Sequence, residues 1–151
     1  MKVPVLTVAE GRPSDLDEVL ALLAASGLGA DGVPEHITDF LVARSNGRVV
    51  GAAALEDYSV AGLLRSVAVA PDRRDWGLGR YLTHALIERS RRRGHAALYL
   101  LTDTAQAYFE RFGFRPIDRS AVRPAVLASA QFQGELCKSS ITMVLEFDSG
   151  A

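Results

Sequence analysis

Residues 63–80 read Leu63-Leu-Arg-Ser-Val-Ala-Val-Ala-Pro-Asp-Arg-Arg-Asp-Trp-Gly-Leu-Gly-Arg80, and the predicted fold rests on this stretch. The apolar run from Leu63 to Ala70 indicates a buried strand, which Pro71 ends. A helix is predicted from Gly77 to Arg93, because apolar side chains recur there at helical spacing and Gly94 can end it. The stretch therefore predicts a strand, a turn and a long helix in direct succession.

The start of this predicted helix is suited to binding an anion. The first N–H groups of a helix have no partner within it, and the helix dipole is positive there, so phosphate binds readily. Gly77 and Gly79 lack side chains, which lets phosphate oxygens approach the backbone. Positive charge is added by Arg73, Arg74 and Arg80. A Gly-x-Gly pattern alone also fits a helix that only packs closely against a strand, and that alternative stays open.

The remaining pattern predicts an α/β fold in which the front half of the sheet is antiparallel and a β-α-β crossover follows. Asn46-Gly47 between two apolar runs is typical of a hairpin turn, and Ser14 is predicted to cap the first helix. Strands are predicted at 3–9, 40–44, 48–55, 97–101, 114–117 and 141–147, and further helices at 14–26, 34–39, 105–112 and 124–130.

Composition limits the class of protein. The 151-residue chain has a formal net charge of -1, whereas proteins that bind nucleic acid usually carry a basic excess, so no nucleic-acid partner is expected. No apolar run approaches the roughly 20 residues of a membrane span, so no membrane partner is expected. One cysteine, Cys137, fits a reducing cytoplasm. The three histidines have no metal-ligand spacing, so no metal is expected.

Two motifs resemble those of a known family. Arg74-x-x-Gly77-x-Gly79, after Val67-Ala-Val-Ala-Pro71, looks like the acetyl-CoA signature of the GNAT superfamily of N-acetyltransferases. Ala105-Gln-Ala-Tyr-Phe-Glu-Arg-Phe-Gly-Phe114 resembles the second motif of that superfamily, and the order of elements matches over nearly the whole chain. The resemblance implies one N-acetyltransferase domain over residues 1–151. Its sheet would be mixed and mostly antiparallel, with flanking helices and a splayed central β-α-β unit.

The resemblance also implies that acetyl-CoA is the co-substrate. The backbone of residues 67–69 would bind the pantetheine arm, and the N–H groups that open the long helix would bind the pyrophosphate. The side chains beside the arm would be those of Tyr108, Phe109 and Arg111. The residues so assigned are Val67, Ala68, Val69, Arg74, Asp75, Trp76, Gly77, Leu78, Gly79, Arg80, Thr102, Tyr108, Phe109 and Arg111.

Acetyl transfer to an amine needs a neutral amine, a donor to the carbonyl oxygen and a proton for the leaving thiolate. The family often places a tyrosine four residues before the glycine of the Gly-Phe pair as the thiolate acid. Phe109 occupies that position here, and Tyr108 precedes it, so Tyr108 is either the acid or only a packed aromatic. Glu56 is the first candidate for the general base, directly or through a water, unless it is a solvated strand end. Tyr58 and Ser66 are alternatives.

Arg65 lies in an otherwise apolar strand, where an unpaired charge is costly. It either pairs with Glu56 or presents its fork to a carboxylate of the acceptor. A narrower resemblance, through residues 62–69, 99–104, 109–114 and 137–143, is to the N-acetyltransferases encoded with arsenic-resistance genes. Those enzymes are taken to acetylate the amine of glutamate analogues such as arsinothricin. By analogy, the acceptor pocket would contain Glu56, Tyr58, Arg65, Ser66, Ser139 and Ser140.

Other functions fit the same fold. The acceptor could be an amine of a protein or a polyamine, although a polyamine site is expected to be acidic and the predicted pocket contains Arg65. The domain could also be a non-catalytic acetyl-CoA-binding regulatory module, which the missing tyrosine favours. A toxin that acts on charged tRNA is disfavoured by the weakly acidic charge balance. Small members of the family often pair, so the resemblance further implies a homodimer, with the last strand as its interface.

Overall fold

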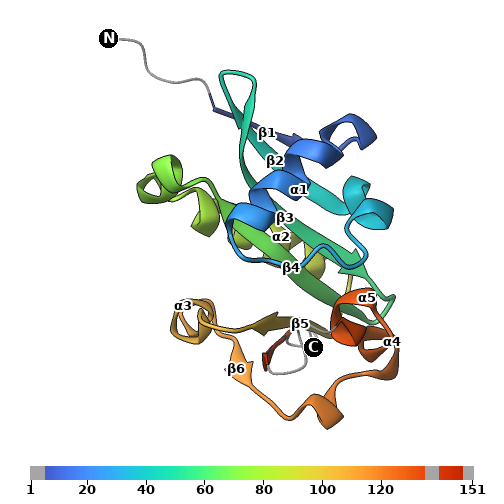
Figure 1. Cartoon of the computed structure of the whole chain (residues 1–151). Helices are drawn as coiled ribbons and strands as arrows, with labels where there is room; N and C mark the ends of the chain where they lie inside the picture. The colour runs from blue at the N-terminus through green and yellow to red at the C-terminus, as the bar shows by residue number, and fades with distance from the viewer. Residues whose placement is uncertain (1–5, 135–139, 148–151) are drawn as a thin grey trace. The chain divides into compact units, whose positions relative to one another are not determined.

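A computed structural model describes residues 6–134 and 140–147 of the chain. Seven strands form one sheet in the order β1-β2-β3-β4-β5-β7-β6 (Figure 1). The pairs β1–β2, β2–β3, β5–β7 and β6–β7 are antiparallel, and β4–β5 is parallel. The sequence-based prediction of an α/β fold with a mostly antiparallel sheet and a β-α-β crossover is therefore confirmed.

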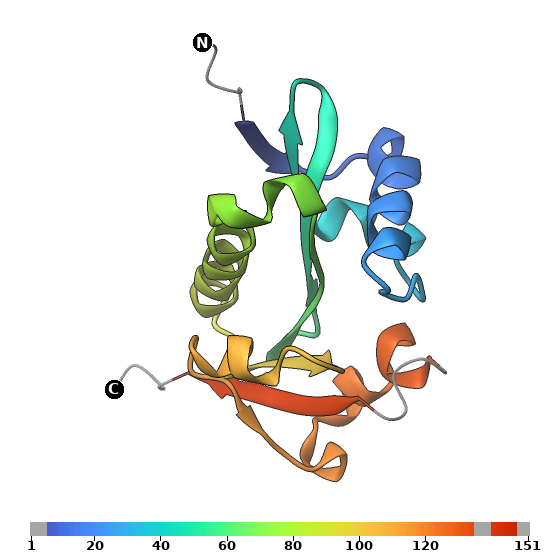
Figure 2. The ribbon, with the colours of Figure 1, turned by 60° about the vertical axis from the view of Figure 1, so that its left-hand side comes forward.

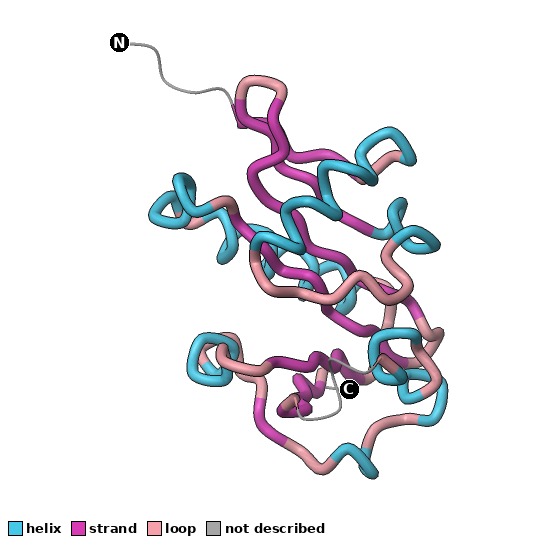
Figure 3. The backbone as a smooth tube through the Cα atoms, in the orientation of Figure 1, coloured by secondary structure: helices cyan, strands magenta, loops and turns pink. Residues whose placement is uncertain are grey.

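The elements follow one another with short connections (Figure 3). The strands are β1 Leu6–Glu10, β2 Phe40–Ser45, β3 Arg48–Asp57, β4 Ala61–Val69, β5 Ala97–Thr102, β6 Arg115–Pro116 and β7 Ile141–Glu146. The α-helices are α1 Leu16–Ala25, α2 Leu78–Arg92, α3 Gln106–Glu110, α4 Pro124–Leu127 and α5 Ala130–Gln133. The 3-10 helices are η1 Pro13–Asp15, η2 Pro34–Asp39, η3 Pro71–Trp76 and η4 Arg119–Ala121.

The chain divides into two compact units. The first unit comprises Met1–Ala54 and Ser66–Ala85, and the second comprises Leu55–Arg65 and Leu86–Ala151. Strands β3 and β4 and helix α2 each contribute residues to both units, so the boundaries fall inside regular elements rather than in linkers.

In the first unit, strands β1, β2 and the first part of β3 form an antiparallel sheet. The β2–β3 hairpin turns at Asn46 and Gly47, which have φ angles of 53° and 81°, as the Asn-Gly pattern predicts. Figure 2 shows α1 on one face of these strands and the start of α2 on the other. The α2 face packs closely, because a Cβ on Gly51 of β3 would lie 2.7 Å from a methyl group of Leu78.

The prediction that Ser14 caps the first helix is wrong. Pro13 starts a 3-10 turn, since its fixed φ angle and missing N–H suit the first position of a helix. The carboxylate of Asp15 accepts a hydrogen bond from the backbone N–H of Arg12 at 2.8 Å. Helix α1 then begins at Leu16, with Asp15 in place of Ser14 as its N-cap residue.

In the second unit, the first residues of β4 pair with β5, and β7 lies between β5 and β6. The parallel register joins only Ala61–Leu63 to Ala97–Tyr99, although β4 runs on to Val69 and β5 to Thr102. The splayed arrangement of the two central strands stays a prediction.

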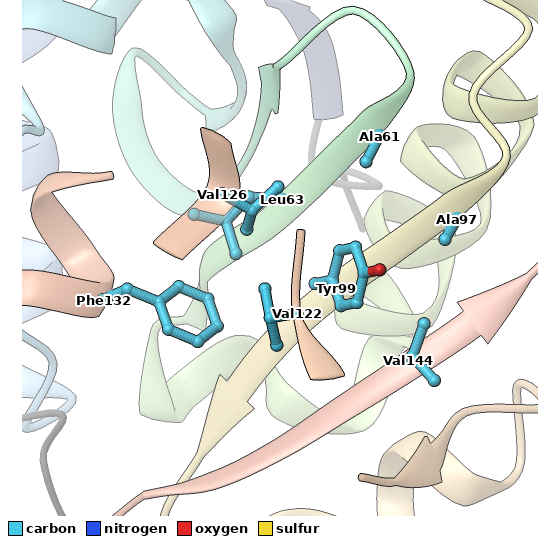
Figure 4. Packing of buried hydrophobic residues seen from close by; sticks show 8 residues of the cluster. All are labelled: Ala61, Leu63, Ala97, Tyr99, Val122, Val126, Phe132 and Val144. Carbon is cyan, nitrogen blue, oxygen red and sulfur yellow. The ribbon is translucent and has the colours of Figure 1, made fainter. Parts of the chain in front are cut away.

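A hydrophobic cluster holds the second unit together (Figure 4). Val126 and Phe132 point from α4 and α5 toward Leu63 of β4 and Tyr99 of β5, so these two short helices cover this part of the sheet. The predicted helix at 124–130 is in fact two short helices. Ser129 begins the second, because its hydroxyl accepts a hydrogen bond from the N–H of Phe132 at 3.3 Å.

Candidate active site

The turn between β4 and α2 lies wholly in the first unit. The N–H of Ala70 donates to the carbonyl of Val50 at 2.8 Å, which anchors the end of β4 to β3. The turn η3 follows, and Gly77 then adopts a left-handed φ angle of 72° directly before α2. The N–H of Tyr81 donates to the carbonyl of Gly77 at 3.0 Å. The amides that precede Tyr81 at this helix end are the ones that helix geometry leaves for an external acceptor.

Gly77 leaves the backbone at the start of α2 accessible. A residue with a side chain is strained at a φ angle of 72°, whereas glycine adopts it without cost. A Cβ built on Gly77 would meet no atom within 4 Å, so the space beside the backbone here is open. An anion could therefore approach the first turn of α2, as the Gly77-x-Gly79 pattern predicts.

The arginines beside the turn are not equivalent. The Nε atom of Arg74 donates to the carbonyl of Val69 at 3.2 Å, which ties the turn to the end of β4. Arg73 contacts the carboxylate of Asp72 at 2.8 Å, and its guanidinium carbon lies 4.5 Å from the ring centroid of Trp76. Arg48 binds the same carboxylate at 2.7 Å. Part of the positive charge at the turn is thus engaged within the protein.

The electrostatics of Asp72 fit this arrangement. Desolvation by itself raises the pKa of this carboxyl group, but the hydrogen bond from Arg48 and the charges of Arg48 and Arg73 outweigh it and hold the pKa below 3.8. Arg74 and Arg80 are exposed, and the indole of Trp76 is 45% exposed, whereas Leu78 faces the core. The turn and the start of α2 therefore bring the predicted pyrophosphate-binding residues 74–80 together in one place.

Strand β4 is irregular just before the residues predicted to bind pantetheine. Ser66 is buried and has a φ angle of 60°, which is uncommon for a residue with a side chain and is often found at functional sites. Val67 and Val69 are half-buried and Ala68 is buried, so the residues after Ser66 alternate in exposure as in a regular strand.

The other predicted cofactor residues lie in the second unit. The Thr102 hydroxyl accepts a hydrogen bond from the N–H of Ala105 at 3.0 Å and so shapes the start of α3. The half-buried ring of Tyr108 packs edge-on against Phe109 and Phe112, with centroid distances of 5.1 and 5.3 Å. Arg111 is exposed. The packed-aromatic interpretation of Tyr108 thus has direct geometric support, and its role as an acid stays a prediction.

Three of the predicted acceptor residues meet in the second unit. Arg65 Nη1 lies 3.1 Å from Glu56 Oε2, and both side chains are only 1% exposed. The hydroxyl of Tyr58 donates to the other oxygen, Oε1 of Glu56. The interpretation of Glu56 as a solvated strand end is therefore wrong, because β3 carries it into the interior. Of the two readings of Arg65, the structure shows the ion pair with Glu56.

Tyr58 extends this cluster to the segment between β6 and β7. Burial, and next the hydrogen bond to the Glu56 carboxylate, raise the pKa of the Tyr58 phenol well above 10. Tyr58 also packs against the hydrophobic cluster that contains Val126 and Phe132 of this segment. Sequence reasoning missed Ser129, although a serine directly before the short run 130–133 is a helix-capping signal.

The three serines predicted in the acceptor pocket are placed differently. Ser66 belongs to the first unit, at the irregular position of β4. Ser140 donates to the carboxylate of Asp103, just after β5, at 2.5 Å. Ser139 lies outside the described residues, as does Cys137.

The histidines have structural partners. His95 is buried, with Nδ1 at 2.7 Å from the hydroxyl of Ser90 and Nε2 at 2.9 Å from Asp57. His36 lies 2.8 Å from Asp39. Within residues 6–134 and 140–147, no group of three or more His, Cys, Asp and Glu side chains is arranged to hold a metal ion. None of the helices in these ranges is long and apolar enough to span a membrane.

Two curated relatives resemble part of the chain. An uncharacterized N-acetyltransferase of Chlorobaculum tepidum is 32% identical over 90 residues, which are 59% of this chain and 57% of that protein. An amino-acid acetyltransferase of Neisseria meningitidis is 25% identical over 119 residues, which are 73% of this chain and 27% of that protein. The chain thus spans well under two thirds of the length of either relative.

Solved structures share the fold. The N-acetylglutamate synthase of Neisseria gonorrhoeae, complexed with coenzyme A and N-acetyl-glutamate, has a TM-score of 0.79 at 21% identity over 97% of this chain and 36% of that chain. A GNAT-family acetyltransferase of Staphylococcus aureus has a TM-score of 0.78 at 17% identity over 95% of this chain and 100% of that chain. Structural similarity at sequence identities this low shows only that the fold is shared.

A family model described as an acetyltransferase (GNAT) domain matches residues 36–116. The matched region covers more than half of the 151 residues and contains the β4–turn–α2 unit as well as helix α3. The chain therefore belongs to the family of GNAT acetyltransferase domains.

Proposed function

We propose that this chain is an acetyl-CoA-dependent N-acetyltransferase whose acceptor is the amine of a small amino-acid-like molecule. The amine attacks the thioester directly in a ternary complex, and the whole activity resides in one domain over residues 1–151. The observation that carries the proposal is the turn that leads from β4 into α2. Its left-handed Gly77 and the open space beside it fit a pyrophosphate at the first amides of the helix.

Each part of the proposed site has a distinct task. Amides at the start of α2, near Gly79 and Arg80, hold the pyrophosphate, while the exposed Arg74 adds charge. Backbone N–H groups of residues 67–69 serve the pantetheine arm and the carbonyl oxygen, on which negative charge develops during attack. Tyr108 supplies a proton to the leaving thiolate, and Glu56 is the base.

A glutamate analogue such as arsinothricin or phosphinothricin is the proposed acceptor. Relatives named amino-acid acetyltransferase and N-acetylglutamate synthase support an amino-acid-like substrate. In this proposal the guanidinium of Arg65 binds a carboxylate of the acceptor and the carboxylate of Glu56 at the same time. Its planar set of N–H donors can bind two carboxylates. We further propose that the protein acts as a homodimer in the cytoplasm and needs no metal ion. These parts of the proposal rest on sequence pattern and family resemblance.

The test is acetyl-CoA consumption against an acceptor panel. The panel contains glutamate, phosphinic and arsinic glutamate analogues, spermidine and a lysine peptide. The proposal expects turnover of the acidic amino acids, and a higher KM for them in Arg65→Lys, which keeps a charge beside Glu56 but loses the planar fork.

Other results have clear meanings. Turnover of spermidine or the peptide alone would replace the proposed acceptor. Tight CoA binding without turnover of any acceptor would favour a regulatory module. If Arg65→Lys left the KM for acidic acceptors unchanged, the proposal that Arg65 binds the acceptor carboxylate would be wrong.

A further inference from the structure

Strand β1 forms one edge of the sheet and is exposed along its length. Within the described ranges it is the terminal strand of the sheet, so β2 covers only one of its two sides (Figure 1). Four of its five residues are exposed, among them the apolar Leu6 at 40%, and Val8 is half-buried. An edge strand of this kind presents a row of backbone N–H and C=O groups to any strand that comes beside it.

The two edges of the sheet differ in how they are protected against pairing. At the other edge, β6 has only two residues, of which Pro116 has no N–H and Arg115 binds Glu146 of β7. Short strands, prolines and charges are the usual devices that prevent edge-to-edge pairing. Strand β1 pairs with β2 over five residues without a bulge, and residues 6–10 contain no lysine, no proline and one charge, on Glu10. The β1 edge is therefore the one that is suited to pairing.

The backbone groups on the open side of β1 follow from its pairing with β2. The N–H of Gly11 donates to the carbonyl of Phe40 at 2.9 Å, and this pair continues the β1–β2 register. In an antiparallel pair, residues that bond to the partner strand alternate with residues whose N–H and C=O point away from it. The groups that point away from β2 thus belong to every second residue before Gly11, counted from its neighbour: Leu6, Val8 and Glu10.

This strand is complementary to a second copy of itself. When two β1 strands run antiparallel about a two-fold axis at Val8, each Val8 lies opposite the other, and Leu6 lies opposite Glu10 of the other copy. Outward-pointing residues then meet at all three positions, and a β-branched pair occupies the centre. The two Glu10 residues lie four positions apart along the paired strands, or about 14 Å, which exceeds the screening length in physiological salt. Because both copies use the same surface, the assembly closes as a dimer.

We propose that β1 pairs with β1 of a second copy of this chain, antiparallel and with Val8 at the two-fold axis. This inference gives an interface to the homodimer of the proposed function and rests on that part of it. The family resemblance suggests the last strand instead, but β7 already has β5 on one side. On its other side it pairs with β6, and the N–H of Ile117 donates to the carbonyl of Thr142 at 2.9 Å. Strand β7 therefore has less backbone open to a second copy than β1 has.

Charges placed at the axis test this register. Val8→Glu or Val8→Lys alone puts two like charges opposite each other, so each variant should raise the dimer dissociation constant by at least about tenfold. Mixed in equal amounts, the two variants should form a heterodimer with nearly the wild-type affinity, because opposite charges then face each other. Sedimentation velocity over a range of protein concentrations measures these constants.

A second variant tests the backbone contacts. Val8→Pro removes the N–H that donates across the axis and none that donates to β2, so the fold should be kept. One hydrogen bond from each copy is lost, and the dissociation constant should rise by roughly 10- to 100-fold. Thr7→Glu is the matched control, because residue 7 is exposed and lies opposite Ala9 of the other copy and Arg44 of its own β2. It should dimerise as the wild type does, and circular dichroism should show that all variants are folded.

The inference is overturned if like charges at position 8 leave dimerisation unchanged, if the mixed variants do not recover it, or if Thr7→Glu disrupts it as strongly. A wild type that stays monomeric at every concentration would remove the interface together with the proposed homodimer. A wild-type dimer that resists all the Val8 variants would remove the β1 interface alone. Acetyl-CoA consumption by the same samples shows separately whether the proposed activity stands.

Discussion

The imidazole of His95 is held by Asp57, with His95 Nε2 2.9 Å from the Asp57 carboxylate at the end of β3. The opposite nitrogen lies 2.7 Å from the hydroxyl of Ser90, which is fully buried near the end of α2. His95 thereby joins α2, the end of β3 and the start of β5 within the second unit. Loss of one side chain would leave a buried hydroxyl without its partner.

We expect His95→Ala to lower the free energy of unfolding by about 1–3 kcal/mol, from the unsatisfied Ser90 hydroxyl and the lost packing. Urea unfolding followed by circular dichroism measures the change. His84→Ala, at an exposed position of α2, is the control and should stay within about 0.5 kcal/mol of the wild type. Equal effects of the two substitutions would show that the His95 contacts do not stabilise the fold.

The buried ion pair makes a prediction about charge. Arg65→Met removes the cation that pairs with the buried Glu56 carboxylate, and we expect a loss of about 3–5 kcal/mol in the free energy of unfolding. Arg65→Met combined with Glu56→Gln should recover much of that loss, because both charges are then gone. A double-mutant cycle by urea unfolding tests this. Additive losses would contradict the direct coupling of the two side chains.

The first unit contains an acid-sensitive contact. Arg44 Nη2 on β2 lies 2.5 Å from Asp15 Oδ1 at the start of α1. Burial alone would raise the pKa of Asp15, but hydrogen bonds from the Arg44 side chain and the Arg12 backbone outweigh it and hold the pKa below 3.8.

The sign of the pH effect follows from this lowered pKa. The contact contributes its full stability above a pH of about 4 and loses it as the pH falls through the folded pKa of Asp15. Thermal unfolding at several pH values should therefore show a steeper acid loss for the wild type than for Asp15→Asn. Parallel curves for the two proteins would contradict the lowered pKa.

Local patterns predicted much of the fold. Asn46-Gly47 fixed the hairpin because few other residues tolerate two consecutive positive φ angles. Gly77 directly precedes α2, and Gly94 lies two residues after its last residue. These features depend on the backbone conformation of a few adjacent residues, so they can be predicted from the sequence of those residues.

Features that depend on distant residues were harder to predict. The burial of Glu56 follows from Arg65 and Tyr58 packing against it, and nothing in the adjacent sequence distinguishes it from an exposed strand end. Val126 and Phe132 reach the cluster against which Tyr58 packs only because α4 and α5 fold back onto β4 and β5. The 3-10 turn η3 likewise had no strong local signal beyond Pro71.

The central claim is that the first turn of α2 binds the pyrophosphate of CoA. Trp76 is the only tryptophan of the chain and is 45% exposed beside that turn, so its fluorescence reports on binding there. We predict that titration with CoA changes this emission saturably. Gly79→Val, which places a side chain over the first amides, should weaken binding by about 10- to 100-fold, the value of one or two charge-assisted hydrogen bonds. Gly47→Asn, in the distant hairpin turn of the same unit, should bind CoA as the wild type does. Absence of CoA binding by the wild type, or unchanged affinity in a folded Gly79→Val, would contradict the claim.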